Sequence, residues 1–110
     1  MTEQGKKYLS DIIQAVELIK SFTTGINDFE VYVSDLKTQS AVERQLGIIG
    51  EAVSKFEKLY PGITLANAHK IVGLRNKLIH SYDIIDPSII WAIINNHLES
   101  LRQEVEENLL

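Results

Sequence analysis

Arg75, Asn76, His80 and Tyr82 form a short polar set whose side chains can do acid–base chemistry on a phosphodiester. A neutral histidine can take the proton from a ribose 2′-hydroxyl because its pKa lies near neutral pH, and a protonated histidine can donate to the leaving 5′-oxygen. An arginine can hold the phosphate through two hydrogen bonds and stabilise its developing charge. The set therefore suits metal-free cleavage of RNA, whereas DNA lacks the attacking hydroxyl.

The spacing of Arg75 and His80 restricts how the two side chains can act together. Five residues apart, they point about 140° away from each other on an ideal helix. Either the helix ends or distorts before His80, or the site is shared between two subunits whose two-fold axis brings together two arginines and two histidines. Asn76, one turn before His80, can orient the imidazole or bind phosphate. On spacing alone, an exposed histidine and a helix-end arginine are the commoner explanation.

The helix that carries this set is expected to run from near Thr64 or Asn67 to His80–Tyr82. Its apolar face also holds Arg75, and an arginine there must be paired, reach solvent or stand at a cleft. The members of the apolar face are Ile71, Leu74, Leu78 and Tyr82. The opposite face is a candidate surface for a second subunit, because Gly73 would permit close contact. The members of this opposite face are His69, Gly73, Asn76 and His80.

Apolar residues at helical spacing predict four main helices and one short helix, and the short connections favour an all-α, up-and-down four-helix bundle. The expected ranges are 4–23, 28–33 for the short helix, 35–59, 64–82 and from 86 onward. Asn27 with Glu30 is a capping-box pattern for the short helix, although Val31 to Val33 would also suit a strand if a partner strand existed. Gly25 suits a left-handed cap after the first helix. The tail, 104–108, is expected to be a solvated acidic end.

The long helix carries a stripe of small residues, namely Ser40, Gly47, Gly50 and Ser54. A glycine inside a helix costs about 1 kcal/mol relative to alanine. Close approach of another helix, or of a second subunit, would compensate for that cost. Alternatively the glycines are merely tolerated, and the sequence leaves both interpretations open.

The composition suits one globular domain over residues 1–110, with 45% hydrophobic and 24% charged residues. The absence of cysteine excludes disulfides and cysteine-based metal sites. The three histidines lack a carboxylate pattern that would favour a metal site, and no cofactor motif is found. No apolar signal or membrane segment stands out, so a cytoplasmic protein is expected. The net charge is −4, so RNA binding would require a local basic cleft or a transient encounter.

Two blocks of the chain carry a resemblance to a known family. The stretch from Gly73 to Tyr82 resembles the R-x4-H-x-Y signature of HepT-like toxins of the HEPN superfamily. The stretch from Gln39 to Ala52 resembles the pattern Q-x-A-V-x-R-x-L-x-x-I-G-E-A of the same family. Gly47 stands where an acidic residue is frequent in the family, and Leu65 stands near a position often occupied by tryptophan. The likeness covers nearly the whole chain.

The resemblance implies a HEPN-like homodimer in which two signatures face each other across a cleft and cleave RNA, as the toxin of a type II toxin–antitoxin pair. It implies catalytic roles for Arg75 and His80, with Asn76 in support. It also implies that an MntA-like minimal nucleotidyltransferase antitoxin silences the toxin by attaching AMP to Tyr82, where added bulk and negative charge would exclude RNA. Helical phase alone would instead place Tyr82 on the core face.

A second class of function fits the same chain. A non-catalytic helical subunit could bind substrate or partner proteins alongside a nucleotidyltransferase, by analogy with bundle domains of similar shape. The acidic net charge favours this alternative. Cleavage of RNA by the isolated protein separates the two functions, whereas a complex with a nucleotidyltransferase fits both.

Overall fold

The computed structural model describes residues 1–81 and 86–110, with side chains described for 1–74 and 86–110. Over these residues the chain forms six α-helices and no β-strand, which confirms the all-α prediction. The helices are α1 (Glu3–Phe22), α2 (Phe29–Ser34), α3 (Leu36–Leu59), α4 (Ala66–Ser81), α5 (Pro87–Asn96) and α6 (Leu98–Leu109). The first four lie within about two residues of their predicted bounds. Val31 to Val33 belong to α2, so the strand alternative is wrong.

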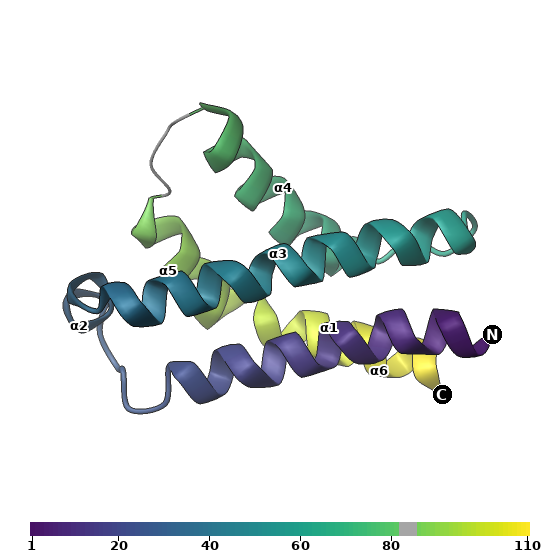
Figure 1. Ribbon diagram of the computed structural model, residues 1–110, viewed down its shortest axis with the longest axis horizontal. Helices are drawn as coiled ribbons and strands as arrows, with labels where there is room; N and C mark the ends of the chain where they lie inside the picture. Colours follow the sequence, from purple (N-terminus) through teal and green to yellow (C-terminus); the bar gives the residue numbers. More distant parts are fainter. Residues whose placement is uncertain (82–85) are drawn as a thin grey trace.

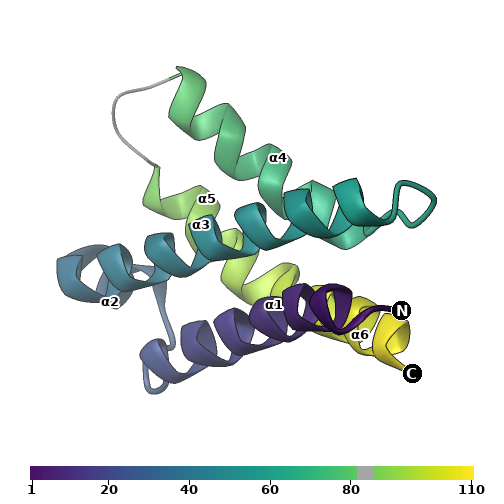
Figure 2. The same cartoon turned by 45° about the vertical axis from the view of Figure 1, so that its right-hand side comes forward.

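The helices form a bundle around the two longest of them. α1 and α3 lie side by side and run in opposite directions in both views (Figures 1 and 2). α6 runs along α1 and ends near the start of α1, so both termini lie at the same end of the molecule. α4 rises away from α3, and α5 leads back toward α6 (Figure 1). No helix in the described part of the chain is long and apolar enough to cross a membrane.

The core is made by the apolar stripes of α1, α3 and α6. Burying one large aliphatic side chain stabilises a fold by roughly 1.5–3 kcal/mol, so these stripes decide which face of each helix turns inward. The fully or almost fully buried members are Leu9, Ile12, Val16 and Ile19 of α1, Val42, Leu46, Ile49, Val53 and Phe56 of α3, and Leu98, Leu101 and Val105 of α6. These buried side chains recur at helical spacing, which is the pattern from which the sequence predicts the helices.

The predicted last helix is in fact two helices. α5 ends at Asn96 and α6 begins at Leu98, with His97 between them at φ −126°. Asparagine and histidine have low helix propensity, and the Asn95 amide donates to the Trp91 carbonyl oxygen at 2.8 Å in the last turn of α5. The break allows the apolar faces of both segments to pack into one core.

Aspartates cap three of the helices. Each carboxylate accepts a hydrogen bond from a backbone N–H in the first turn, at 2.9 or 3.0 Å, and such a cap typically contributes about 1 kcal/mol. The pairs are Asp28 with Val31, Asp35 with Thr38, and Asp86 with Ser88. The cap of α2 is therefore Asp28, and not Asn27 as the capping-box pattern predicted. The left-handed conformation predicted at Gly25 is confirmed, with φ 83°.

Glu104 caps a helix other than its own. Its carboxylate accepts hydrogen bonds from the backbone N–H groups of Asn67 at 3.0 Å and Ala68 at 3.4 Å, at the start of α4. A carboxylate there satisfies donors that lack partners within the helix and also meets the positive end of the helix dipole. The prediction of a fully solvated acidic tail is wrong at Glu104, because this side chain joins α6 to α4.

Replacing Glu104 by alanine should therefore cost more than replacing an exposed glutamate of the same helix. We expect Glu104→Ala to lower the free energy of unfolding by about 1–2 kcal/mol, as for loss of other helix caps. Glu107 is exposed, so Glu107→Ala should change it by less than about 0.5 kcal/mol. Urea unfolding of both variants measures the difference, and equal stabilities would contradict the capping role.

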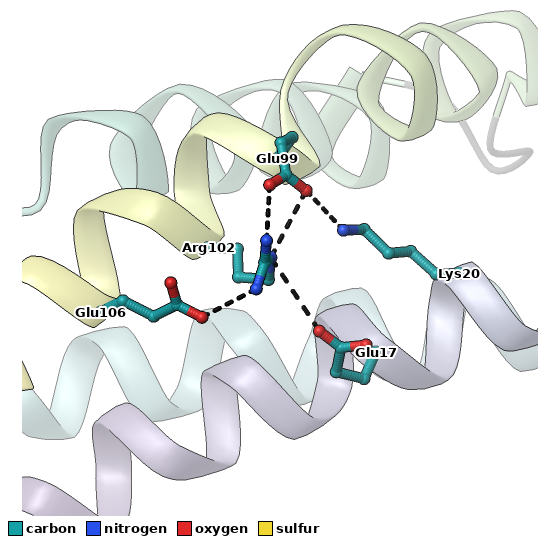
Figure 3. Close-up of polar contacts among 5 residues, drawn as sticks. All are labelled: Glu17, Lys20, Glu99, Arg102 and Glu106. Carbon is teal, nitrogen blue, oxygen red and sulfur yellow. Dashed lines mark hydrogen bonds and ion pairs between the residues drawn. The ribbon is translucent and has the colours of Figure 1, made fainter.

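An ion-pair network joins α1 to α6 (Figure 3). Arg102 donates to Glu99 at 2.7 Å and to Glu106 at 2.8 Å, and Lys20 of α1 donates to the same Glu99 carboxylate. Hydrogen bonds from Arg102 and then Lys20 lower the pKa of Glu99 from 4.5 to about 2. Glu17 of α1 lies 3.9 Å from the Arg102 guanidinium and closes the network. These pairs fix the angle between two helices that the core alone would hold less tightly.

The lowered pKa of Glu99 predicts a pH dependence of stability. A carboxylate whose pKa is lower in the folded state stabilises the fold above its unfolded pKa and loses that effect as pH falls toward the folded pKa. We therefore expect the unfolding free energy of the wild type to fall more steeply than that of Glu99→Gln between pH 4.5 and about 2. Urea unfolding at a series of pH values measures both slopes, with Glu107→Gln as the control. Parallel slopes for Glu99→Gln and the wild type would contradict the assignment.

Candidate functional site

The predicted catalytic residues lie on one helix. Arg75, Asn76 and His80 all fall within α4, which extends from Ala66 to Ser81. Their side chains lie outside the described part of the structure, and Tyr82 lies outside the described residues altogether. Their chemical roles remain predictions, while the backbone that carries the first three is defined.

The continuity of α4 limits the ways in which Arg75 and His80 can share a substrate. The sequence left open that the helix ends before His80. α4 extends to Ser81, so this alternative is wrong. On a continuous helix the two side chains diverge by about 140°. Of the arrangements considered from the sequence, a site built from two copies of α4 is the one that a regular helix fits.

The two predicted faces of α4 are found in its described half. Ile71 is fully buried and Leu74 is half-buried against the core, whereas His69 and Gly73 are exposed. A Cβ atom added to Gly73 would meet no described atom within 4 Å. The face opposite the core is thus open at Gly73, as a surface for a second subunit would need to be.

Two carboxylates from other helices hold the start of α4. Glu104 of α6 accepts from its first backbone N–H groups, as described above. Glu57 of α3 accepts from the Leu65 N–H at 3.2 Å and lies 2.8 Å from Nε2 of His69. His69 therefore has a structural partner on α3. The attachments fix the N-terminal half of α4, while the signature lies in its other half.

Among the described residues, the small-residue stripe of α3 approaches α4 at Gly50. A Cβ atom built on Gly50 would lie 3.8 Å from a methyl carbon of Val72, which is ordinary van der Waals contact. α4 therefore approaches α3 here, but the approach alone would also accommodate alanine. Ser40 and Ser54 of the same stripe are exposed. The contact with α4 thus accounts for only part of the stripe.

One buried polar group escaped the sequence analysis. The Tyr32 side chain is completely buried, packs its ring 5.2 Å from that of Trp91, and has no hydrogen-bond partner for its hydroxyl among the described residues. Burial, and secondarily Glu43, raises the pKa of this hydroxyl, and burial also raises the pKa of the Glu43 carboxyl. Nothing in the sequence around Val31 to Val33 distinguishes this tyrosine from an exposed one. No cluster of metal-ligating side chains is found in the described part of the chain.

Comparisons with known proteins place the chain among ribonucleases. The family model described as "Ribonuclease HepT-like" matches residues 12–108. A protein of Thermococcus cleftensis named "Probable ribonuclease HepT" is 39% identical over 111 residues, which cover 97% of each chain. A protein of Methanocaldococcus jannaschii described as a candidate RNase is 37% identical over 106 residues, covering 93% of this chain and 84% of its own. A candidate RNase of Caldanaerobacter subterraneus is 35% identical over 105 residues, covering 94% and 93%.

No solved structure gives a match. The family match begins inside α1 and ends inside α6, so it includes the whole of α4 and the stretch from Arg75 to Tyr82. The relatives match over nearly the full length of this chain, which leaves no part of the bundle outside the likeness. The chain belongs to the HepT-like ribonuclease family.

Proposed function

We propose that this chain is an RNase that acts as the toxin of a type II toxin–antitoxin pair, and that Arg75 and His80 carry its chemistry. One observation carries the proposal. The pattern R-x4-H-x-Y occurs at Arg75 to Tyr82, in a chain that matches proteins named as ribonucleases over most of their length. All other parts of the proposal follow from what these side chain types can do to a phosphodiester.

The proposed reaction is attack by a ribose 2′-hydroxyl on the adjacent phosphorus. Neutral His80 of one copy takes the hydroxyl proton, the 2′-oxygen bonds to phosphorus, and the bond to the 5′-oxygen breaks. Protonated His80 of the second copy gives its proton to that leaving oxygen, so the products are a 2′,3′-cyclic phosphate and a 5′-hydroxyl. Arg75 holds the non-bridging oxygens and stabilises their added charge. Each step uses a side chain as acid, base or cation, so the reaction needs no metal ion.

The requirement for one basic and one acidic histidine supports a homodimer. A single chain supplies one His80, and residues five apart point about 140° away from each other on an ideal helix. A two-fold axis beside α4 would bring together two copies of Arg75 and two of His80. No described atom lies within 4 Å of a Cβ atom added to the exposed Gly73, so a second copy of the helix has space to approach there. Asn76, one turn before His80, would orient the imidazole or hold phosphate.

Tyr82 is the proposed regulatory residue. It follows His80 by two positions, so an AMP group on its hydroxyl would add bulk and negative charge beside the catalytic histidine. RNA would then be excluded by repulsion between phosphates and by loss of space. The proposed partner is an MntA-like nucleotidyltransferase antitoxin that attaches this AMP.

The first test is RNA cleavage by the purified protein. We expect His80→Ala to lower the cleavage rate by about 10²–10⁴-fold, which is typical for loss of a general acid–base group. Arg75→Ala should lower it by about 10²–10³-fold, which is typical for loss of a donor that stabilises transition-state charge. His97→Ala removes a histidine between α5 and α6 whose side chain makes no capping hydrogen bond, and it should leave the rate unchanged. EDTA should have no effect, and the products should carry 2′,3′-cyclic phosphate ends. Undiminished cleavage by His80→Ala would refute the assigned role, and no cleavage by a folded wild-type dimer would favour the non-catalytic alternative.

The second test concerns Tyr82. Incubation with ATP and an MntA-like nucleotidyltransferase should raise the intact mass by adenylyl groups and abolish RNA cleavage. Tyr82→Phe should keep the unmodified mass and remain active, whereas Tyr60→Phe, at a partly buried tyrosine elsewhere, should be modified like the wild type. An unchanged wild-type mass, or an adenylyl group retained by Tyr82→Phe, would count against this regulation.

A further inference from the structure

A groove runs along the outer side of the α1–α3 pair. Three neighbouring hollows of about 180, 210 and 340 Å³ are lined only by residues of these two helices. The hollow of 180 Å³ lies between the other two. It shares Tyr8 and Lys55 with the hollow of 340 Å³, and Asp11 and Ile48 with the hollow of 210 Å³. On α1 the lining extends from Gln4 to Leu18, about 21 Å at 1.5 Å per residue. The three hollows therefore form one continuous shallow groove.

The groove gathers positive charge in an acidic protein. Four cations line it, against only two carboxylates, although the chain as a whole has a net charge of −4. The cations are Lys7, Arg44, Lys55 and Lys58, and the carboxylates are Asp11 and Glu51. This is the local basic cleft that an acidic protein would need in order to bind a polyanion.

The two carboxylates of the groove each pair with a lysine of their own helix. The Lys7–Asp11 and Lys55–Glu51 distances are both 3.0 Å, and the lysine side chains remain 69% and 52% exposed. Such exposed pairs are weak, so a phosphate oxygen can share or replace the carboxylate at little cost. The Glu51 hydrogen bond, and to a smaller extent Tyr8 and Asp11, raise the pKa of the Lys55 ammonium, which stays charged at neutral pH.

The floor of the groove offers an aromatic ring and apolar surface. Tyr8 is half-buried between the lysines, and the Gln4 amide donates to its hydroxyl at 2.6 Å, which fixes the ring. Ile48 and Leu18 are also half-buried along the same line. Single-stranded nucleic acids bind surfaces of this kind, where cations follow the backbone and an aromatic side chain stacks on a base.

We propose that the α1–α3 groove binds single-stranded RNA, with phosphates on Lys7, Lys55 and Lys58 and an unpaired base against Tyr8. The inference rests on the proposed RNase function, which makes RNA the polyanion that this protein must meet. It assigns substrate binding to a surface separate from the signature on α4. A groove of this length would contact a few nucleotides, and it would add affinity without regard to sequence because its contacts are to phosphate and to the face of a base.

Fluorescence anisotropy with a short single-stranded 2′-O-methyl RNA tests the groove without cleavage, because that RNA lacks the reactive hydroxyl. For the full-length double variant Lys55→Gln, Lys58→Gln we expect Kd to rise about tenfold. The slope of log affinity against log salt should fall by about 1.4, since each lost contact to a single strand removes about 0.7. Tyr8→Ala should also raise Kd several-fold, and Tyr8→Phe, which keeps the ring, should restore wild-type binding.

The matched control is Lys37→Gln, which removes an exposed lysine that lies outside the groove. Its Kd should equal that of the wild type. The proposal is overturned if the double variant and Tyr8→Ala bind within twofold of the wild type, or if Lys37→Gln weakens binding as much as either of them. It is also overturned if light scattering shows that the groove variants change the oligomeric state, because the groove would then be an interface between copies.

Cleavage assays on ordinary RNA separate this proposal from the proposed function. Groove-dependent binding without any cleavage would keep the RNA groove and refute the RNase. Cleavage that depends on His80, together with unchanged Kd in the groove variants, would keep the RNase and refute the groove. Circular dichroism and urea unfolding of each variant establish that a change in Kd reflects lost contacts in a folded protein.

Discussion

The packing of α1 against α3 is the contact on which the rest of the structure depends. Each helix carries an apolar stripe at helical spacing, and antiparallel pairing buries both stripes together with that of α6. The outer sides of the same two helices stay exposed and form the groove around Tyr8 and Ile48. The remaining side of α3 supports α4, where Gly50 faces Val72. One packing contact thus determines both the surface proposed for RNA and the position from which the signature helix extends.

Two carboxylates of other helices hold α4 at the end remote from its signature. Glu57 and Glu104, from two different helices, bind the first turn and the residues just before it. Because a carboxylate at a helix N-terminus satisfies free N–H groups, these contacts fix the direction of the helix without covering its sides. The face at Gly73 therefore stays open. The described contacts of α4 with these two carboxylates therefore set where the helix starts and the direction in which the signature is carried.

Much of the fold could be predicted because burial repeats with the period of the helix. The stripes of α1 and α3, and the approximate ends of four helices, followed from apolar spacing and Gly25. The division of the last helix at His97 was missed because the low helix propensity of asparagine and histidine is only a weak signal. No proline or glycine marks the break. The roles of Glu104 and Tyr32 were missed because each depends on a partner distant in sequence. For the candidate site, the resemblance to a family supplied the residues, and the structure defines the helix that carries three of them. Their roles and the pairing of two chains stay predictions, because one chain does not describe a partner.

The net charge of −4 argues against RNA binding only if the carboxylates lie where RNA would approach. In the described part of the chain several of them are already engaged by backbone amides or by cations. Those that bind amides are Asp28, Asp35, Asp86 and Glu104, and those that pair with Arg102 are Glu99 and Glu106. Each such contact offsets the negative charge at short range, and salt screens what remains beyond about 10 Å. The charge that a phosphate would meet in the α1–α3 groove is therefore set by four local cations and two carboxylates, and an acidic composition is compatible with a basic binding surface.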